Sequence, residues 1–246
     1  MKDTNKSKEL NDELEKTSNE NNDQKNSSLN FINEFVQKNG RMIVIFSVAL
    51  ILLIGLILLF RANSQKNELN ASKALARIES YYTNGEYENA LFAPDSLPLI
   101  RGEKLIGLVK IIDEYGSTLA GERAALFAAD AFYQLGKYSD AKIYYEKAIQ
   151  SGIQEIKVGG LAGTGACNER DGKLKDAAAN YLKAVDLIAD EGLQLRYLYF
   201  AALCNEKVGE KDAAKKIYRQ IINMNKYGEF NNMAKAGIIR LGEEVE

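Results

Sequence analysis

The order of polar and apolar residues divides the chain into three segments. Polar residues fill positions 1–41, an unbroken apolar run fills 42–60, and the remaining residues mix both kinds at helical spacing. From residue 69 onward, apolar residues recur every three or four positions and the breaks fall at glycines. We therefore predict an all-α protein with a polar tail, one apolar helix and a domain of short helices.

The apolar run is long enough to cross a lipid bilayer. Its 19 residues carry no charge and lie between Arg41 and Arg61. At about 1.5 Å per residue, such a helix spans roughly 28 Å, close to the hydrocarbon thickness of a membrane. A cleavable signal peptide has a shorter apolar core and a small-residue cleavage site, which residues 60–63 do not offer. We predict a single transmembrane helix over 42–60.

The charges that flank this run do not decide its orientation. Lys38 and Arg41 precede it, whereas Arg61, Lys66 and Lys73 follow it, so the positive-inside rule is close to a tie. The run contains no GxxxG motif, so dimerisation through this helix is not indicated.

The first 41 residues have the composition of a disordered tail. Asn, Lys, Glu, Asp and Ser dominate, and they cannot bury enough surface to offset the entropy of ordering. Residues 1–41 carry 7 Lys and Arg against 8 Asp and Glu, and residues 62–246 carry 24 against 26. Neither segment is basic, which argues against a nucleic-acid-binding protein.

A sequence pattern repeats in the third segment. Gly136, Gly172 and Gly209 are 36 and then 37 residues apart, and a related sequence follows each of them. A small residue comes five positions later and a tyrosine four positions after that: Ala141 and Tyr145, Ala177 and Tyr181, Ala214 and Tyr218. This period indicates a solenoid of helix–turn–helix units.

The repeat divides residues 61–246 into units. We expect repeats at about 120–155, 158–191 and 195–228, and then a capping helix over 230–242. An irregular first unit, 64–115, has its own turn at Gly85. Pro94 and Pro98 interrupt this unit, which resumes with a helix from about 103 to 115.

The pattern resembles the tetratricopeptide repeat (TPR) family over about residues 120–228. The family's turn glycine, small residue, aromatic residue and second small residue match Gly136, Ala141, Tyr145 and Ala148. The small residue of the first helix matches Ala129, Gly165 and Ala202 in successive units. The family's tryptophan near the unit start and its closing proline are absent. The resemblance implies a TPR-type solenoid of three to four units.

The same resemblance assigns a protein-binding groove to the first helices of the units. The groove positions of the family correspond here to Arg123, Asp130, Tyr133, Gln134, Glu169, Arg170, Arg196, Tyr199, Glu206 and Lys207. Arg and Tyr are favoured anchors of protein interfaces. The alternative is a solvated face on which these charges pair with one another.

One ligand of the family is not expected. TPR proteins that clamp the tails of cytosolic chaperones use Lys and Asn at fixed groove positions. This chain has Leu126 and Asp130, Ala162 and Ala166, and Tyr199 and Leu203 there.

The composition also argues against an enzyme. The chain has no His, and its two cysteines, Cys167 and Cys204, occupy equivalent repeat positions without a CxxC motif. Neighbouring first helices pack about 8–10 Å apart, beyond disulfide reach, so we expect two buried packing residues. The glycines at 159, 160, 163 and 165 lack the GK[ST] of a phosphate loop, and close helix packing is the better account. No catalytic residue, cofactor, metal or small-molecule substrate is expected.

The arrangement of tail, span and repeats resembles bacterial inner-membrane proteins of the YfgM type. That resemblance implies a cytoplasmic N-terminus, a periplasmic repeat domain, and partners such as the Sec translocon, chaperones or exported chains. The sequence thus favours a membrane-anchored scaffold that assists such a complex. A receptor or regulator facing the cytoplasm is the alternative.

Overall fold

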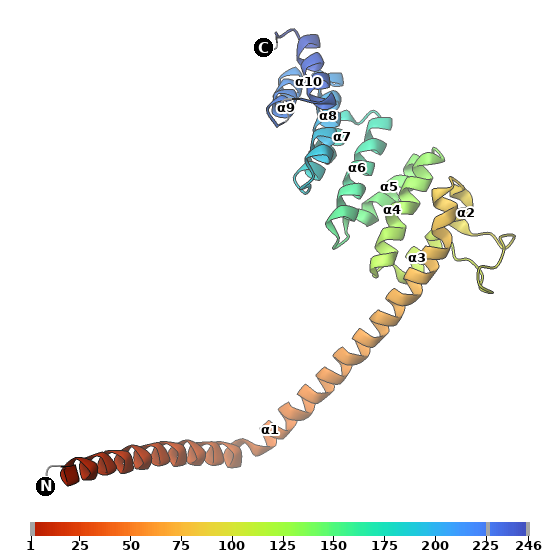
Figure 1. The fold of residues 1–246 in the computed structure, drawn as a ribbon. Coiled ribbons are helices and arrows are strands. Elements are labelled where there is room, and N and C mark those ends of the chain that lie inside the picture. The colour runs from red at the N-terminus through yellow and green to blue at the C-terminus, as the bar shows by residue number, and fades with distance from the viewer. Residues whose placement is uncertain (1–2, 225–226, 245–246) are drawn as a thin grey trace. The chain divides into compact units, whose positions relative to one another are not determined.

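Helices make up the folded part of the chain. The computed structural model describes residues 3–224 and 227–244, and no strand occurs among them beyond an isolated bridge between Ile100 and Glu103. The all-α prediction is therefore confirmed. The chain divides into two compact units, Met1–Asn63 and Ser64–Glu246 (Figure 1).

The first unit consists of helix α1, which spans Asp3–Thr83 and continues into the second unit. The predicted start of this helix was residue 42, so the structure differs from the sequence analysis over 3–41, where we expected a disordered tail. The segment contains no proline, and its many Lys and Glu residues are compatible with a helix. Residues 1 and 2 lie outside the described part.

The apolar part of α1 is exposed. The large side chains at Met42 and from Val44 to Phe60 are about half exposed or more, with Phe60 at 76%. This is the one helix among the described residues that is long and apolar enough to cross a membrane, and its most apolar window has a mean hydropathy of 3.3.

The second unit begins with an irregular helical cluster. The C-terminal part of α1 packs Ala71, Ala74, Leu75 and Ile78 into the core with α2 (Tyr87–Phe92), α3 (Leu108–Tyr115) and α4 (Leu119–Gln134). Glu68 fixes this arrangement, because its carboxylate accepts hydrogen bonds from the free N–H groups of Leu119 and Ala120 at 2.7 and 3.2 Å.

The helix expected over 103–115 begins later than predicted. Residues 100–103 form a turn in which Arg101 and Gly102 have φ angles of 54° and 77°. A left-handed backbone cannot continue into a right-handed helix, so α3 begins at Leu108, after the extended residue Gly107.

Three helix pairs follow, and each consists of a first and a second helix. The first helices are α4, α6 (Gln154–Arg170) and α8 (Glu191–Lys207), and the second helices are α5 (Tyr138–Ile149), α7 (Leu174–Val185) and α9 (Lys211–Met224). A further helix, α10 (Glu229–Arg240), lies beyond them. Each helix from α3 to α10 packs against the next, and Figure 1 shows them following one another in chain order.

The turns that follow α1, the three first helices and α10 share one geometry. Gly85, Gly136, Gly172, Gly209 and Gly242 all have φ between 73° and 84°. In each turn the N–H after the glycine bonds back to a carbonyl five residues earlier, as Lys173 does to Asn168 at 2.8 Å. These bonds form the Schellman cap of a helix, and only glycine adopts this left-handed backbone without strain.

Small residues let the paired helices approach closely. A Cβ added at Gly163 in α6 would lie 2.1 Å from the Tyr145 ring of α5, and one at Gly165 would lie 2.9 Å from the Tyr181 ring of α7. The glycines of α6 therefore accommodate the tyrosines of two neighbouring second helices. Cys167 and Cys204 are buried and free, as expected of packing residues.

Candidate functional site

The candidate site is the face of the second unit built by the first helices and α10. The ten residues assigned to a groove from the sequence lie on three elements: Arg123, Asp130, Tyr133 and Gln134 on α4, Glu169 and Arg170 on α6, and Arg196, Tyr199, Glu206 and Lys207 on α8. The structure brings six of these ten side chains into cross-helix polar contacts.

The first set of contacts repeats within each helix pair. The tyrosine of the second helix donates a hydrogen bond to a carboxylate on the first helix in all three pairs. Tyr145 binds Asp130 at 2.5 Å, Tyr181 binds Glu169 at 3.4 Å, and Tyr218 binds Glu206 at 2.6 Å.

Burial keeps these phenols protonated. It is the largest cause that raises the pKa of Tyr145, Tyr181 and Tyr218, and the neighbouring carboxylates raise it further. Each tyrosine therefore remains a donor across the physiological pH range.

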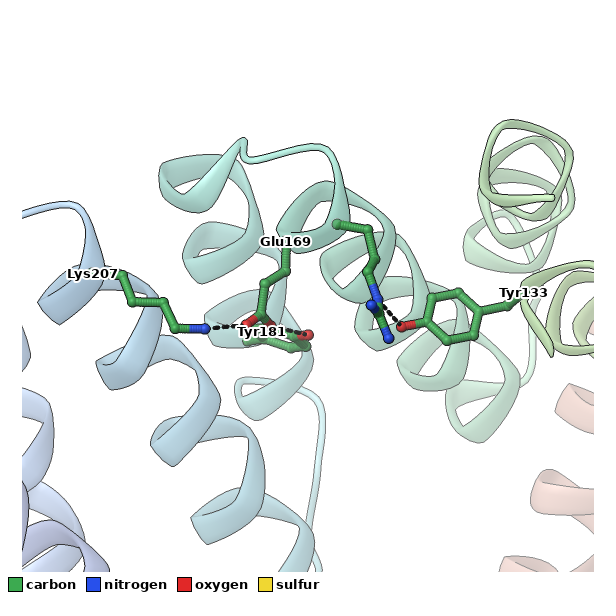
Figure 2. Close-up of polar contacts among 5 residues, drawn as sticks. Tyr133, Glu169, Tyr181 and Lys207 are labelled. Carbon is green, nitrogen blue, oxygen red and sulfur yellow. Dashed lines mark hydrogen bonds and ion pairs between the residues drawn. The ribbon is translucent and has the colours of Figure 1, made fainter. Parts of the chain in front are cut away.

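A second set of contacts joins successive first helices. On one side of each contact is the residue three positions before the turn glycine of a first helix. On the other side is the basic residue two positions before the turn glycine of the following first helix, or of α10 after α8. Glu169 accepts a hydrogen bond from Lys207 at 2.7 Å, and Glu206 accepts two from Arg240 at 2.9 and 3.0 Å. Figure 2 shows Glu169 between Tyr181 and Lys207. We call these contacts the rungs.

The remaining rung has no carboxylate. Tyr133 occupies the position of Glu169 and Glu206, and its hydroxyl accepts a hydrogen bond from the Nε–H of Arg170 at 3.4 Å (Figure 2). The guanidinium of Arg170 also lies over the Tyr138 ring, 5.6 Å from its centre. Two aromatic residues thus hold this arginine in place of an acid.

The carboxyl groups differ in their environment. The hydrogen bonds from Arg240 hold the pKa of Glu206 below its usual range, against a smaller opposing effect of burial. Burial raises the pKa of Asp130, although the hydrogen bonds from Tyr145 and Tyr82 oppose this rise. Asp130 on α4 thus accepts hydrogen bonds from Tyr82 on α1 and Tyr145 on α5, so its carboxylate links three helices.

Four predicted residues stay outside the rungs and the tyrosine–carboxylate contacts. Arg123, Gln134 and Arg196 are exposed, and within the described part of the chain they form neither a hydrogen bond nor an ion pair. Arg123 lines a separate cavity of about 250 Å³ beside the C-terminal part of α1. Tyr199 packs its ring against Tyr218 and Phe230, with centroids 6.1 Å apart in both cases.

A cavity of about 730 Å³ opens between the rungs of α4, α6 and α8. Its polar lining comes from Tyr133, Glu169, Arg170 and Lys207, and its apolar lining includes Ala166, Leu174, Tyr181 and Phe200. A second cavity, of about 400 Å³, lies at the other ends of α6 and α8 and is lined mainly by apolar side chains.

The sequence analysis missed two members of this site, Arg240 and Tyr138. A signal for Arg240 was present, because Arg240-Leu241-Gly242 repeats the order of Lys207-Val208-Gly209. No such signal marks Tyr138, whose role depends on the position of Arg170 in the folded chain.

The cysteines are poorly suited to redox or metal chemistry. Burial raises the pKa of Cys167 and of Cys204 to about 11, so both remain thiols at neutral pH. Among the described residues, no group of three or more His, Cys, Asp or Glu side chains is placed to hold a metal ion. No protein-family model matches this chain, and a search of curated proteins finds no match either.

Proposed function

We propose that this chain is a membrane-anchored scaffold that holds other proteins on the face of its first helices. The observation that carries the proposal is the cavity of about 730 Å³, where aromatic and basic side chains from three successive first helices converge. Tyr and Arg dominate the binding energy of many protein interfaces, and such residues are most effective in concave, partly desolvated places.

The proposal includes a TPR-type solenoid. Three helix pairs with equivalent turns, a period of 36 and 37 residues and packing between consecutive helices support it. In such arrays the first helices line the surface on which a partner lies.

The proposal also includes a membrane anchor. No part of the most apolar window of α1 is buried within the described structure. Exposing that many large apolar side chains to water is unfavourable by roughly 25 cal/mol per Å², whereas a bilayer would cover all of them. A tether of this kind raises the local concentration of the repeats at a membrane complex without requiring high affinity.

We place the repeats outside the cytoplasm, in the bacterial periplasm. The likeness to proteins of the YfgM type supports this orientation, and it suggests the Sec translocon, chaperones or exported chains as partners. The role is binding and not catalysis, which the absence of His from the sequence supports.

A cytoplasm-facing receptor is the second candidate. Three basic residues, Arg61, Lys66 and Lys73, follow the span, whereas Lys38 and Arg41 precede it. These numbers are close to a tie under the positive-inside rule, so the flanking charges leave this orientation open.

Protease protection separates the two candidates. The full chain with a C-terminal tag is produced in a bacterium, and spheroplasts are treated with protease before and after lysis. Loss of the tag in intact spheroplasts supports the periplasmic scaffold. Protection until lysis overturns that orientation and favours the receptor.

Site-specific crosslinking tests whether the face binds proteins. A photo-reactive amino acid replaces Gln134, which is exposed and adjacent to Tyr133, or Lys216, which is exposed on α9. We expect discrete protein adducts from position 134 and none from position 216. Equal adducts from both positions, or none from either, would argue against binding at this face.

A further inference from the structure

The rungs differ in how their basic residue is neutralised. Lys207 and Arg240 occupy equivalent positions on successive helices, and each is paired with a glutamate. Arg170 occupies the same position on α6 but has no ion pair among the described residues. Its partner position holds Tyr133, which removes the acid and keeps a hydroxyl acceptor.

Arg170 is nevertheless held in one orientation. Its Nε–H binds the Tyr133 hydroxyl, and its planar head lies over the Tyr138 ring. Among the described residues, the two terminal nitrogens of the guanidinium have no hydrogen-bond partner. A planar pair of N–H donors matches the two oxygens of a carboxylate.

The surroundings of Arg170 favour an anion. Of the side chains that line the cavity, Arg170 and Lys207 are positive and Glu169 is negative, and Lys207 already neutralises Glu169. The cavity is therefore left with one positive charge, on Arg170. Ala166, Tyr181 and Phe200 lie in the same cavity and offer an apolar surface beside this charge.

We propose that Arg170 binds a carboxylate of a partner polypeptide, which completes the rung that the chain itself leaves without an acid. The partner segment carries an acidic group next to an apolar or aromatic side chain, and that side chain packs against Ala166, Tyr181 and Phe200. The Tyr133 hydroxyl positions the guanidinium by accepting its Nε–H, and its own O–H donates to the same carboxylate. This inference rests on the proposed scaffold function and specifies what the scaffold recognises.

A peptide selection with the full chain tests the inference. The chain is reconstituted in lipid nanodiscs, a random peptide library is selected on them, and empty nanodiscs remove background. We expect enrichment of peptides with Asp or Glu adjacent to a large apolar residue. Enrichment of peptides without an acid overturns the inference and leaves the scaffold function standing, whereas no enrichment over empty nanodiscs counts against both.

Variants then locate the contact. A hydrogen-bonded charge pair contributes enough that Arg170→Met is expected to weaken a selected peptide by about tenfold or more. Arg170→Lys, which keeps the charge but loses the planar fork, should restore only part of the affinity. Lys216→Met removes one positive charge from α9 and serves as the matched control, with binding within about twofold of wild type.

A double-mutant cycle on peptide and protein distinguishes loss of this contact from loss of folding. The selected peptide is compared with its Glu→Gln form on the wild-type chain and on Arg170→Met. We expect the wild-type chain to discriminate by about tenfold and the variant to bind both peptides equally. If Arg170→Met still discriminates, or if Lys216→Met loses as much affinity as Arg170→Met, the inference is wrong.

The source of the carboxylate is decided with the same peptides. Each is synthesised with a free and with an amidated C-terminus. We expect the affinity to survive amidation, because the contact is made by the Asp or Glu side chain, whereas affinity that is lost on amidation overturns the assignment to an acidic side chain.

Discussion

The tyrosines of the second helices serve two purposes at once, packing and hydrogen bonding. The ring of Tyr145 lies against Gly163, and its hydroxyl binds Asp130 on the neighbouring helix. The ring of Tyr181 lies against Gly165 while its hydroxyl binds Glu169. A shift of one of these rings also moves its hydroxyl away from the carboxylate that it binds. Small substitutions beside the rings are therefore expected to lower the stability of the domain.

Gly163→Ala should destabilise the repeat domain. The new Cβ would lie 2.1 Å from a ring carbon of Tyr145, and the cost of overpacking exceeds the gain in helix propensity, for a net loss of about 1–2 kcal/mol. Gly159→Ala on the same helix is the control, since its Cβ would meet only the flexible end of Leu126, at 3.0 Å. Thermal unfolding followed by circular dichroism compares them, and equal melting temperatures would contradict the packing argument.

The Glu206–Arg240 rung should give acid-dependent stability. Because the folded-state pKa of Glu206 is lowered, the rung stabilises the fold above the unfolded-state pKa of about 4.3, and this contribution is lost as the pH falls through the folded value. Arg240→Met should lower the melting temperature at pH 7 by no more than about 2–4 °C, because the pair is partly exposed. The difference should vanish once the pH is low enough to protonate Glu206. A difference that is independent of pH would show that Arg240 acts through packing alone.

At the scale of helices, the turns are the most regular feature. Gly172 has a φ of 74° and nothing within 4 Å of an added Cβ, so a substitution there changes only the backbone energy. Gly172→Ala should cost about 1–2 kcal/mol of unfolding free energy, and Gly172→Asn should cost less, because Asn adopts this conformation more readily. Chemical denaturation measures both. Equal losses for Ala and Asn would indicate that the turn is strained for another reason.

The sequence predicted the helix pairs because their turns recur, but it did not predict where irregular helices begin. The glycines at 136, 172 and 209 end helices by the same backbone mechanism, which a periodic pattern reveals. The start of α3 depends instead on a turn at Arg101 and Gly102, which occurs once in the part of the chain that the structure describes. The sequence analysis did not predict that α1 begins at Asp3, because apolar residues do not recur at helical spacing in the polar tail.

That the chosen residues form a protein-binding groove stays a prediction, and their mutual contacts were not foreseen. Equivalent positions on α6 and α8 lie side by side, so Glu169 and Lys207 meet although 38 residues separate them. A single sequence shows which residues share a position, but it does not show that Tyr133 leaves Arg170 without an acid. That contrast emerges only when all the rungs are compared in the folded chain.

The apolar part of α1 belongs to the first unit of the chain, and the second unit has its own hydrophobic core. The core of the second unit includes Ala71, Ala74, Leu75 and Ile78 from α1, and the carboxylate of Glu68 caps α4. The domain therefore begins within α1. A truncation that removes all of α1, up to Thr83, would remove part of the core.

A fragment of residues 64–246 should fold on its own, whereas a fragment of 84–246 should be much less stable. The first keeps the four buried α1 side chains and the second loses them, at about 1 kcal/mol or more for each lost side chain. Circular dichroism and denaturant titration of the two fragments check this. Equal stability would mean that the α1 residues do not belong to the domain.

The shared geometry of the turns has a consequence for how this architecture could grow. The segment from 173 to 209 starts just after one left-handed glycine and ends on the next, so both of its ends meet the chain in the same backbone conformation. A tandem copy of that segment would insert one more helix pair without altering any existing turn. Gene duplication could thus lengthen the chain by whole helix pairs, and each added pair would bring a further rung.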